Sequence, residues 1–169
     1  MGIFNLTKLG SSPEVFTEIS KSLLLAGYSI RFNAVGDSML PLLRDGDLVI
    51  VEAIKTDRLR NGEIVYYQND QGHCLLHRII RQRTITGRLE LQVQADNNLK
   101  PDGWISVEQV MGRLNRFCRN GEWVCLESFG SRTAALLILV QQRLNLNKYD
   151  RFRSHRQILR FLPGICRLF

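Results

Sequence analysis

The chain has 169 residues, of which 44% are hydrophobic, and a formal net charge of +7. This length and composition suit one domain of ordinary size with a core of its own and one appendage. Its cysteines have no regular spacing and too few histidines beside them, which argues against a disulfide framework and a structural zinc site; they are Cys74, Cys118, Cys125 and Cys166.

The first predicted element is an amphipathic helix near the N-terminus. Ser12 and Pro13 are typical of a helix start, and apolar residues then recur at helical spacing until Gly27, which ends the run. The apolar positions are Phe16, Ile19, Leu23 and Leu24. We expect this helix to pack on the body of the protein or on a partner.

From Tyr28 onward the sequence has the alternation and turn signals of short strands. Asn120-Gly121 is a strong hairpin signal, in whose two-residue register Cys118 faces Trp123. The predicted strands are Tyr28–Ala34, Leu48–Val51, Glu63–Tyr67, Cys74–Ile80, Leu89–Val93, Leu114–Cys118 and Trp123–Leu126. Strands this numerous and short predict a compact, mostly antiparallel β domain.

The C-terminal segment differs in charge from the rest of the chain. Residues 1–130 hold 15 basic and 15 acidic side chains, so the whole excess of charge falls in residues 131–169, with eight basic side chains and one acid. We therefore divide the chain into an N-terminal helical segment (1–28), a β domain (29–130) and a basic helical tail (131–169). A basic tail indicates contact with an anionic surface, and the competing interpretation is a solvated tail.

We expect the anionic surface to be a membrane, with no specific nucleic acid, because Ala134–Val140 adds a short apolar segment to the charge. That run of seven residues is far below the roughly 20 that span a bilayer. The N-terminus lacks the apolar core and small-residue cleavage site of a secretory signal. We therefore expect a cytoplasmic or peripheral membrane protein.

The stretch from Ala34 to Val51 is the most informative for chemistry. A strand leads into Gly36, which permits a tight turn, and Ser38 follows with neighbouring backbone N–H groups. Such a turn can expose a nucleophile beside an oxyanion hole. Turn chemistry alone also explains Gly-Asp-Ser, so the tripeptide by itself leaves both interpretations open.

The longer string, Gly36-Asp37-Ser38-Met39-Leu40-Pro41 followed by Asp45-Gly46-Asp47, resembles the first signature blocks of the signal peptidase I and LexA-type serine peptidase superfamily. The resemblance covers about residues 30–115. It implies a β-rich catalytic fold, Ser38 as nucleophile with its backbone N–H as oxyanion donor, and Gly36, Asp37 and Met39 as supporting or oxyanion residues. Gly36 stands where bacterial signal peptidases often have a serine.

Two later blocks indicate the partners of Ser38. His77-Arg78-Ile79 resembles the general-base block of the endoplasmic-reticulum and archaeal signal peptidases, in which histidine replaces lysine. Asp96, followed by Asn97-Asn98, and Asp102 resemble that type's aspartates; we expect Asp102 to orient His77 and Asp96 to hold the loop. His77 also shares a strand face with Leu75 and Ile79, as a satisfied core histidine would.

The resulting hypothesis is a serine endopeptidase that needs no cofactor or metal and binds a peptide or protein substrate as an extended strand with small side chains near the scissile bond. Two alternatives stay open. One is a LexA-type self-cleaving regulator, and the other is a binding module that retains the fold without catalysis.

Overall fold

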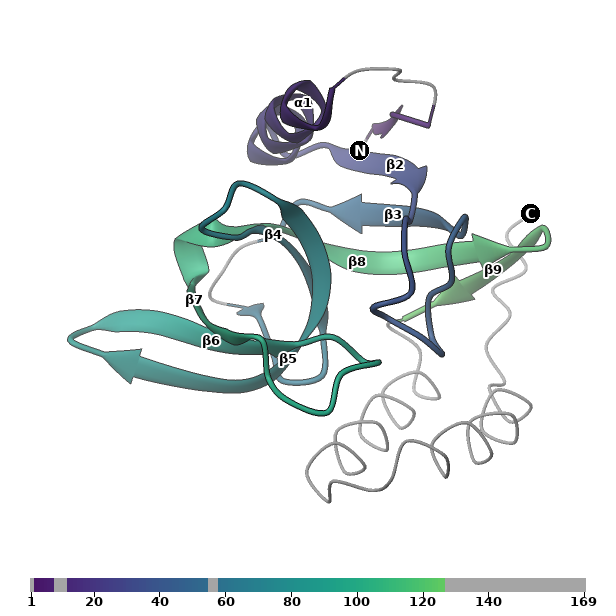
Figure 1. The fold of residues 1–169 in the computed structure, drawn as a ribbon. Helices are drawn as coiled ribbons and strands as arrows, with labels where there is room; N and C mark the ends of the chain where they lie inside the picture. The colour runs from purple at the N-terminus through teal and green to yellow at the C-terminus, as the bar shows by residue number, and fades with distance from the viewer. Residues whose placement is uncertain (1, 8–11, 55–57, 127–169) are drawn as a thin grey trace.

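The computed structural model describes residues 2–7, 12–54 and 58–126, in which one mixed sheet curls around the core and carries a helix at one end (Figure 1). The helix is α1 (Pro13–Leu25). The strands are β1 (Ile3–Asn5), β2 (Ser29–Asn33), β3 (Leu48–Glu52), β4 (Ile64–Gln68), β5 (Cys74–Ile85), β6 (Arg88–Gln94), β7 (Gly103–Ser106), β8 (Val110–Arg119) and β9 (Glu122–Cys125). The predicted mostly β fold with an N-terminal helix is therefore confirmed. The predicted tail, 131–169, lies outside the described residues.

The sheet order is β1-β2-β3-β8-β4-β5-β6-β7, and β9 pairs with β8. Every pairing is antiparallel except that of β1 with β2. β9 follows β8 through Asn120 and Gly121, both at positive φ, and Cys118 faces Trp123 as predicted. Positive φ at both central residues gives the turn the twist that antiparallel strands need.

Helix α1 lies where the sequence places it. Pro13 occupies its first turn, and Gly27, with a φ of +84°, follows its last residues. Leu24 is 2% exposed, and Phe16, Ile19 and Leu23 pack against the same core. The apolar stripe thus fixes α1 against the body of the protein.

Two apolar clusters form the interior, and β4 separates them. Ile64 and Tyr66 face a cluster shared with α1, β2, β3 and β8, whereas Val65 and Tyr67 face a cluster shared with β5, β6 and β7. All four side chains are at most 2% exposed. Because alternate residues of a strand point to opposite faces, β4 contributes to both clusters. The sheet curls because β4 is buried on both of its faces, each against a different cluster.

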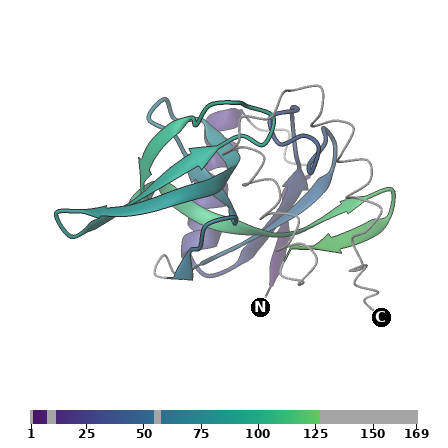
Figure 2. The same ribbon diagram turned by 90° about the horizontal axis from the view of Figure 1, so that it is seen from below.

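The strand predictions differ from the structure at four places, one of which is the start of β8 at Val110, four residues before the predicted Leu114. β5 continues to Ile85, beyond the predicted end at Ile80, because its exposed second half pairs with β6 in a hairpin that projects from the body (Figure 2). β1 and β7 were not predicted, since three or four residues are too few to carry an alternating pattern.

Candidate active site

Ser38 lies on the loop that joins β2 to β3, and its side chain is exposed. The two ends of this loop are held together: the Ala34 N–H donates to Asp47 O at 2.8 Å, and the Gly46 N–H donates to Ala34 O at 2.9 Å. Gly36 has a φ of +89°, a conformation that glycine adopts without the cost of a Cβ. The predicted tight turn before Ser38 is therefore present.

An ion pair secures the second half of the same loop. Asp47 is 6% exposed, and the Arg119 guanidinium, from the end of β8, donates to its two carboxylate oxygens at 2.9 and 2.5 Å. Arg119 also donates to Leu42 O at 2.7 Å. A planar guanidinium binds a carboxylate through two parallel hydrogen bonds, so this contact fixes direction as well as distance. The Ser38 loop is thereby tied to the sheet.

His77 lies in the first half of β5, opposite Val65 of β4, and is 7% exposed. Its Nδ1 lies 2.9 Å from Asp102 Oδ2 and 3.2 Å from the hydroxyl oxygen of Tyr67. Leu75 and Ile79 pack in the same cluster as Tyr67, as expected from the strand phase. His77 is thus a buried imidazole with polar contacts at Nδ1.

Hydrogen bonds to residues other than His77 hold Asp102 in place. Its N–H donates to Val93 O at 3.0 Å, while its carboxylate accepts hydrogen bonds from the Ala95 N–H at 2.8 Å and from Asn98 Nδ2 at 3.1 Å. Burial raises the pKa of Asp102, but the hydrogen bond and charge of His77 and these other donors outweigh it, so the pKa lies below its ordinary value. Asp102 is therefore an ionised acceptor facing His77.

Asn97 connects this pair to the Ser38 loop. Its N–H donates to Ser38 O at 2.9 Å, and its side-chain amide donates to Asp37 O at 3.3 Å. One loop, residues 95–102, therefore contacts the predicted nucleophile and carries the carboxylate beside the predicted base. Among the described residues, Ser38 Oγ and His77 form no hydrogen bond; such catalytic contacts often close only when substrate binds.

Asp96 lies in the interior and binds Arg78. Asp96 and Arg78 are 1% and 2% exposed, and Arg78 donates to the two carboxylate oxygens at 2.8 and 2.6 Å. A third bond, from Arg78 Nη1 to Gly62 O, measures 2.6 Å. The sequence reasoning assigned Asp96 to the loop but missed this partner. An arginine beside the predicted base, on the opposite face of an otherwise aliphatic strand, was the available signal.

The backbone N–H groups near Ser38 differ in whether they already donate a hydrogen bond. The Gly36 N–H donates to Asp45 Oδ1 at 2.8 Å, so it is already used. Met39 is 4% exposed and packs in the first cluster. Within the described part of the chain, the Ser38 N–H donates to no protein acceptor. Ser38 itself therefore retains the N–H that an oxyanion would need.

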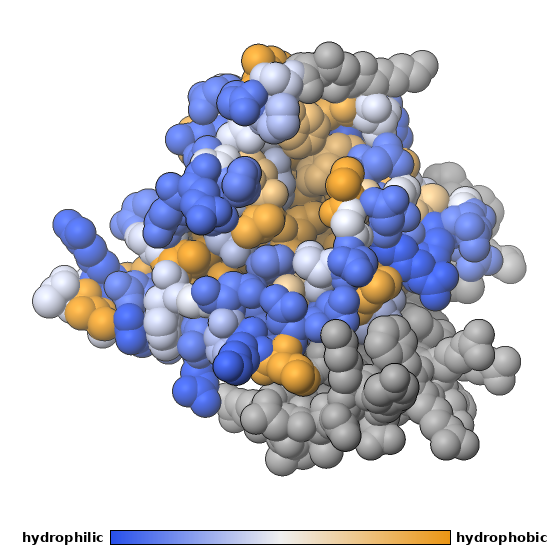
Figure 3. Space-filling view, in the orientation of Figure 1, coloured by the Kyte–Doolittle hydropathy of each residue, from blue (hydrophilic) through white to orange (hydrophobic). Residues whose placement is uncertain are grey.

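A cleft of about 840 Å³ lies beside Ser38, between α1 and the strands β4 and β5. We call it the α1 cleft; it is lined by residues 6–7, 13–14, 16–18, 32–36, 38–39, 43, 66, 68 and 71–76. In Figure 3, apolar side chains gather in the recess below α1. Its volume falls in the range of ordinary ligand pockets.

No three His, Cys, Asp or Glu side chains of the described residues lie close enough together to hold a metal ion. In the same residues, no helix has both the length and the apolar character needed to cross a membrane.

A family model described as Peptidase S24-like matches residues 7–113, which is more than half of the 169 residues. That model belongs to the superfamily of LexA-type and signal peptidase I-type proteins, and it indicates serine peptidase chemistry in general. The chain belongs to the Peptidase S24-like family. No curated protein matches it.

Proposed function

We propose that this protein is a serine endopeptidase that cleaves a peptide or protein by acyl transfer. Ser38 is the nucleophile, His77 the general base and Asp102 the residue that orients His77. The observation that carries the proposal is the 2.9 Å contact between His77 Nδ1 and Asp102 Oδ2, on a loop that also binds Ser38 O through Asn97. Family membership supports the reaction class.

The contact at Nδ1 determines what the imidazole can do. An ionised carboxylate accepts but cannot donate, so the proton of neutral His77 belongs on Nδ1, and Nε2 keeps its lone pair. Ser38 Oγ attacks the substrate carbonyl carbon and passes its proton to Nε2. The imidazolium then protonates the leaving amine, the C–N bond breaks, and an acyl-enzyme remains. Water, deprotonated by His77, hydrolyses that ester.

The developing oxyanion needs donors that are not already used. The Ser38 N–H is the donor proposed here, because the Gly36 N–H is bonded to Asp45. Asp37 contributes through its backbone, whose carbonyl accepts hydrogen bonds from Leu40 and Asn97 and so keeps the turn in shape. Met39 anchors the other side of Ser38 in the core.

More specifically, we propose a signal-peptidase-like enzyme of the Ser-His type, which acts on an extended substrate strand. The pairing of His77 with Asp102, and of Arg78 with Asp96, supports this type because each residue of the matching blocks has a defined contact. A second candidate, a LexA-type self-cleaving regulator, is favoured by the S24-like description of the matching family. The two differ in whether cleavage depends on protein concentration.

Labelling with a fluorophosphonate, which acylates activated serines, tests the proposal directly. We expect the wild-type protein to be labelled at Ser38, Ser38→Ala and His77→Ala to be unlabelled, and all three to share one circular dichroism spectrum. Ser106→Ala is the matched control, because Ser106 is the last residue of β7 and does not belong to the Ser38 loop. Labelling that persists in Ser38→Ala contradicts the serine mechanism. A folded protein with no labelling at all indicates a binding module.

A further inference from the structure

The α1 cleft is larger than small side chains alone need. Ser38 is among its lining residues, so a peptide that presents its scissile carbonyl to Ser38 places neighbouring side chains in this cleft. Small side chains at the bond itself leave most of the roughly 840 Å³ unfilled. The remaining part of the cleft is where a distinctive side chain of the substrate has room to bind.

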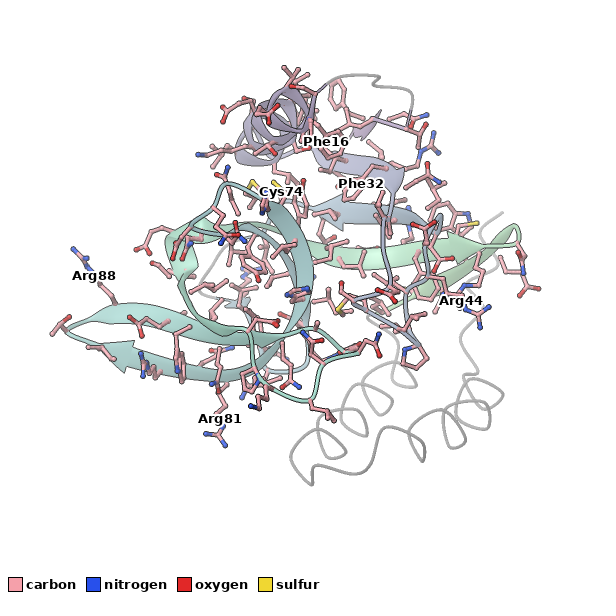
Figure 4. All side chains as sticks on the ribbon, in the orientation of Figure 1. Phe16, Phe32, Arg44, Cys74, Arg81 and Arg88 are labelled. Atoms are coloured by element: carbon pink, nitrogen blue, oxygen red, sulfur yellow. The ribbon has the colours of Figure 1, made fainter. Side chains whose placement is uncertain are left out.

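Aromatic side chains form part of the lining of the cleft, and α1 supplies one of them. Phe16 of α1 meets Phe32 of β2 edge to face, with ring centroids 5.5 Å apart, and Phe32 lies 5.4 Å from the ring of Tyr66 on β4. Figure 4 shows Phe16 and Phe32 together below α1, with Cys74 beside them. All of these residues line the cleft. Such a surface favours a bulky apolar or aromatic side chain.

The rim of the cleft carries charge of one sign. Glu14 and Glu18, one turn apart on α1, are exposed lining residues. The turn between β4 and β5 also lines the cleft, with the neutral side chains of Gln68 and Gln71 and with His73. Neither carboxylate has an ion-pair partner within the described part of the chain. A cationic group beside the apolar side chain therefore finds acceptors at this rim.

We propose that the α1 cleft selects substrates with a bulky apolar residue next to a lysine or arginine, a few positions from the small residues at the scissile bond. The apolar side chain packs against Phe16 and Phe32, and the cation binds Glu14 and Glu18. This inference rests on the proposed peptidase function for the position of the peptide. Helix α1 thereby acts as a specificity element.

Measuring peptide binding to the Ser38→Ala variant, which lacks the proposed nucleophile, separates recognition from catalysis. The probes are fluorescein-labelled decapeptides of one Ala/Ser/Gly background that differ only at two adjacent central positions: Phe-Lys, Ala-Lys, Phe-Gln and Phe-Glu. Fluorescence anisotropy gives the four dissociation constants. We expect Phe-Lys to bind at least about tenfold more tightly than Ala-Lys, since a few buried methylene equivalents give that much discrimination. Phe-Gln should bind more weakly than Phe-Lys, and Phe-Glu the most weakly.

Two variants assign these preferences to residues. Glu14→Gln with Glu18→Gln, both on the surface, should abolish the difference between Phe-Lys and Phe-Gln, whereas Glu122→Gln in the β8–β9 hairpin should not. Phe16→Ala should bring the constants for Phe-Lys and Ala-Lys within about threefold of each other. Val15→Ala, on the exposed side of α1, is its control. The melting temperature of each variant verifies folding.

The outcomes distinguish the two proposals. Equal affinity for Phe-Lys and Ala-Lys overturns the inference, whether or not the wild-type protein cleaves either peptide. The preference, present in Ser38→Ala and lost in Phe16→Ala or in the double glutamine variant, supports it. If the wild-type protein shows that preference but cleaves nothing and resists fluorophosphonate, the peptidase function fails and the α1 cleft remains a peptide-binding site.

Discussion

Replacing Asp96 by alanine tests the interior of the site most severely. The substitution leaves the Arg78 guanidinium, 2% exposed, with its bond to Gly62 O but without its counter-charge. Removing one partner of a buried ion pair costs about 3–5 kcal/mol. For a domain of this size that corresponds to a fall in melting temperature of roughly 6–20 °C. Urea unfolding followed by circular dichroism measures the free energy directly.

Two further variants determine whether the buried charge is the cause. Glu90→Ala removes a partner of Arg83 from an exposed pair, whose side chains are 42% and 31% exposed, and should cost less than about 1 kcal/mol. Arg78→Met combined with Asp96→Leu removes both charges and should recover much of the loss, since apolar replacements of buried pairs are often neutral. If the free energy of unfolding of Asp96→Ala is within about 1 kcal/mol of the wild-type value, burial of the unpaired Arg78 charge does not carry the expected cost.

The remaining predictions concern the proposed catalytic residues and the tail. Asp102→Asn should lower kcat far more than it lowers the free energy of unfolding, because it misorients His77; a large loss of stability with unchanged kcat would refute the assigned role. The lowered pKa of Asp102 means that its contribution to stability is complete above its ordinary pKa of about 4 and is lost as pH falls through the lowered value, so wild type and Asp102→Asn should converge in acid. Tyr67→Phe should lower kcat, since its hydroxyl contacts His77 Nδ1 at 3.2 Å and helps to orient the ring; an unchanged kcat contradicts that role. Truncation after Gly130 should abolish sedimentation with anionic vesicles, because each basic residue near such a surface contributes about 1 kcal/mol; equal sedimentation of the truncated chain shows that the tail is not the anchor.

Local patterns in the sequence predicted much of the sheet. Alternation placed Ile30 and Phe32 in the core, and the Asn120-Gly121 turn set the register of β8 and β9. These features depend on neighbouring residues, which a periodicity captures. β1 was missed because it is three residues long and finds its place only by pairing with β2, 26 positions away.

The sequence predicted which face of its strand His77 occupies, but not all of the contacts between site residues that are distant in the chain. The strand phase of β5 put Leu75, His77 and Ile79 on one face; Leu75 and Ile79 pack in one cluster with Tyr67, and Tyr67 contacts His77. The pairing of Arg78 with Asp96 joins residues 18 positions apart, across the β5–β6 hairpin, and the local pattern around Arg78 does not name its partner. The same holds for Tyr67, whose contact with His77 follows from the pairing of β4 with β5. Long-range contacts arise from the topology of the sheet.

The bond from Asn97 to Ser38 O joins parts that a peptidase of this kind needs at the same moment. Residues 95–102 hold the Ser38 turn from outside, carry the acceptor for His77 and bury Asp96 in the interior. A local opening of this one segment would therefore release all three contacts together. The site should behave as a single cooperative unit: the hydrogen-bonded amides of Ala95, Asn97 and Asp102 should show one common opening free energy in hydrogen exchange, and activity should be lost on warming in the same step as their protection.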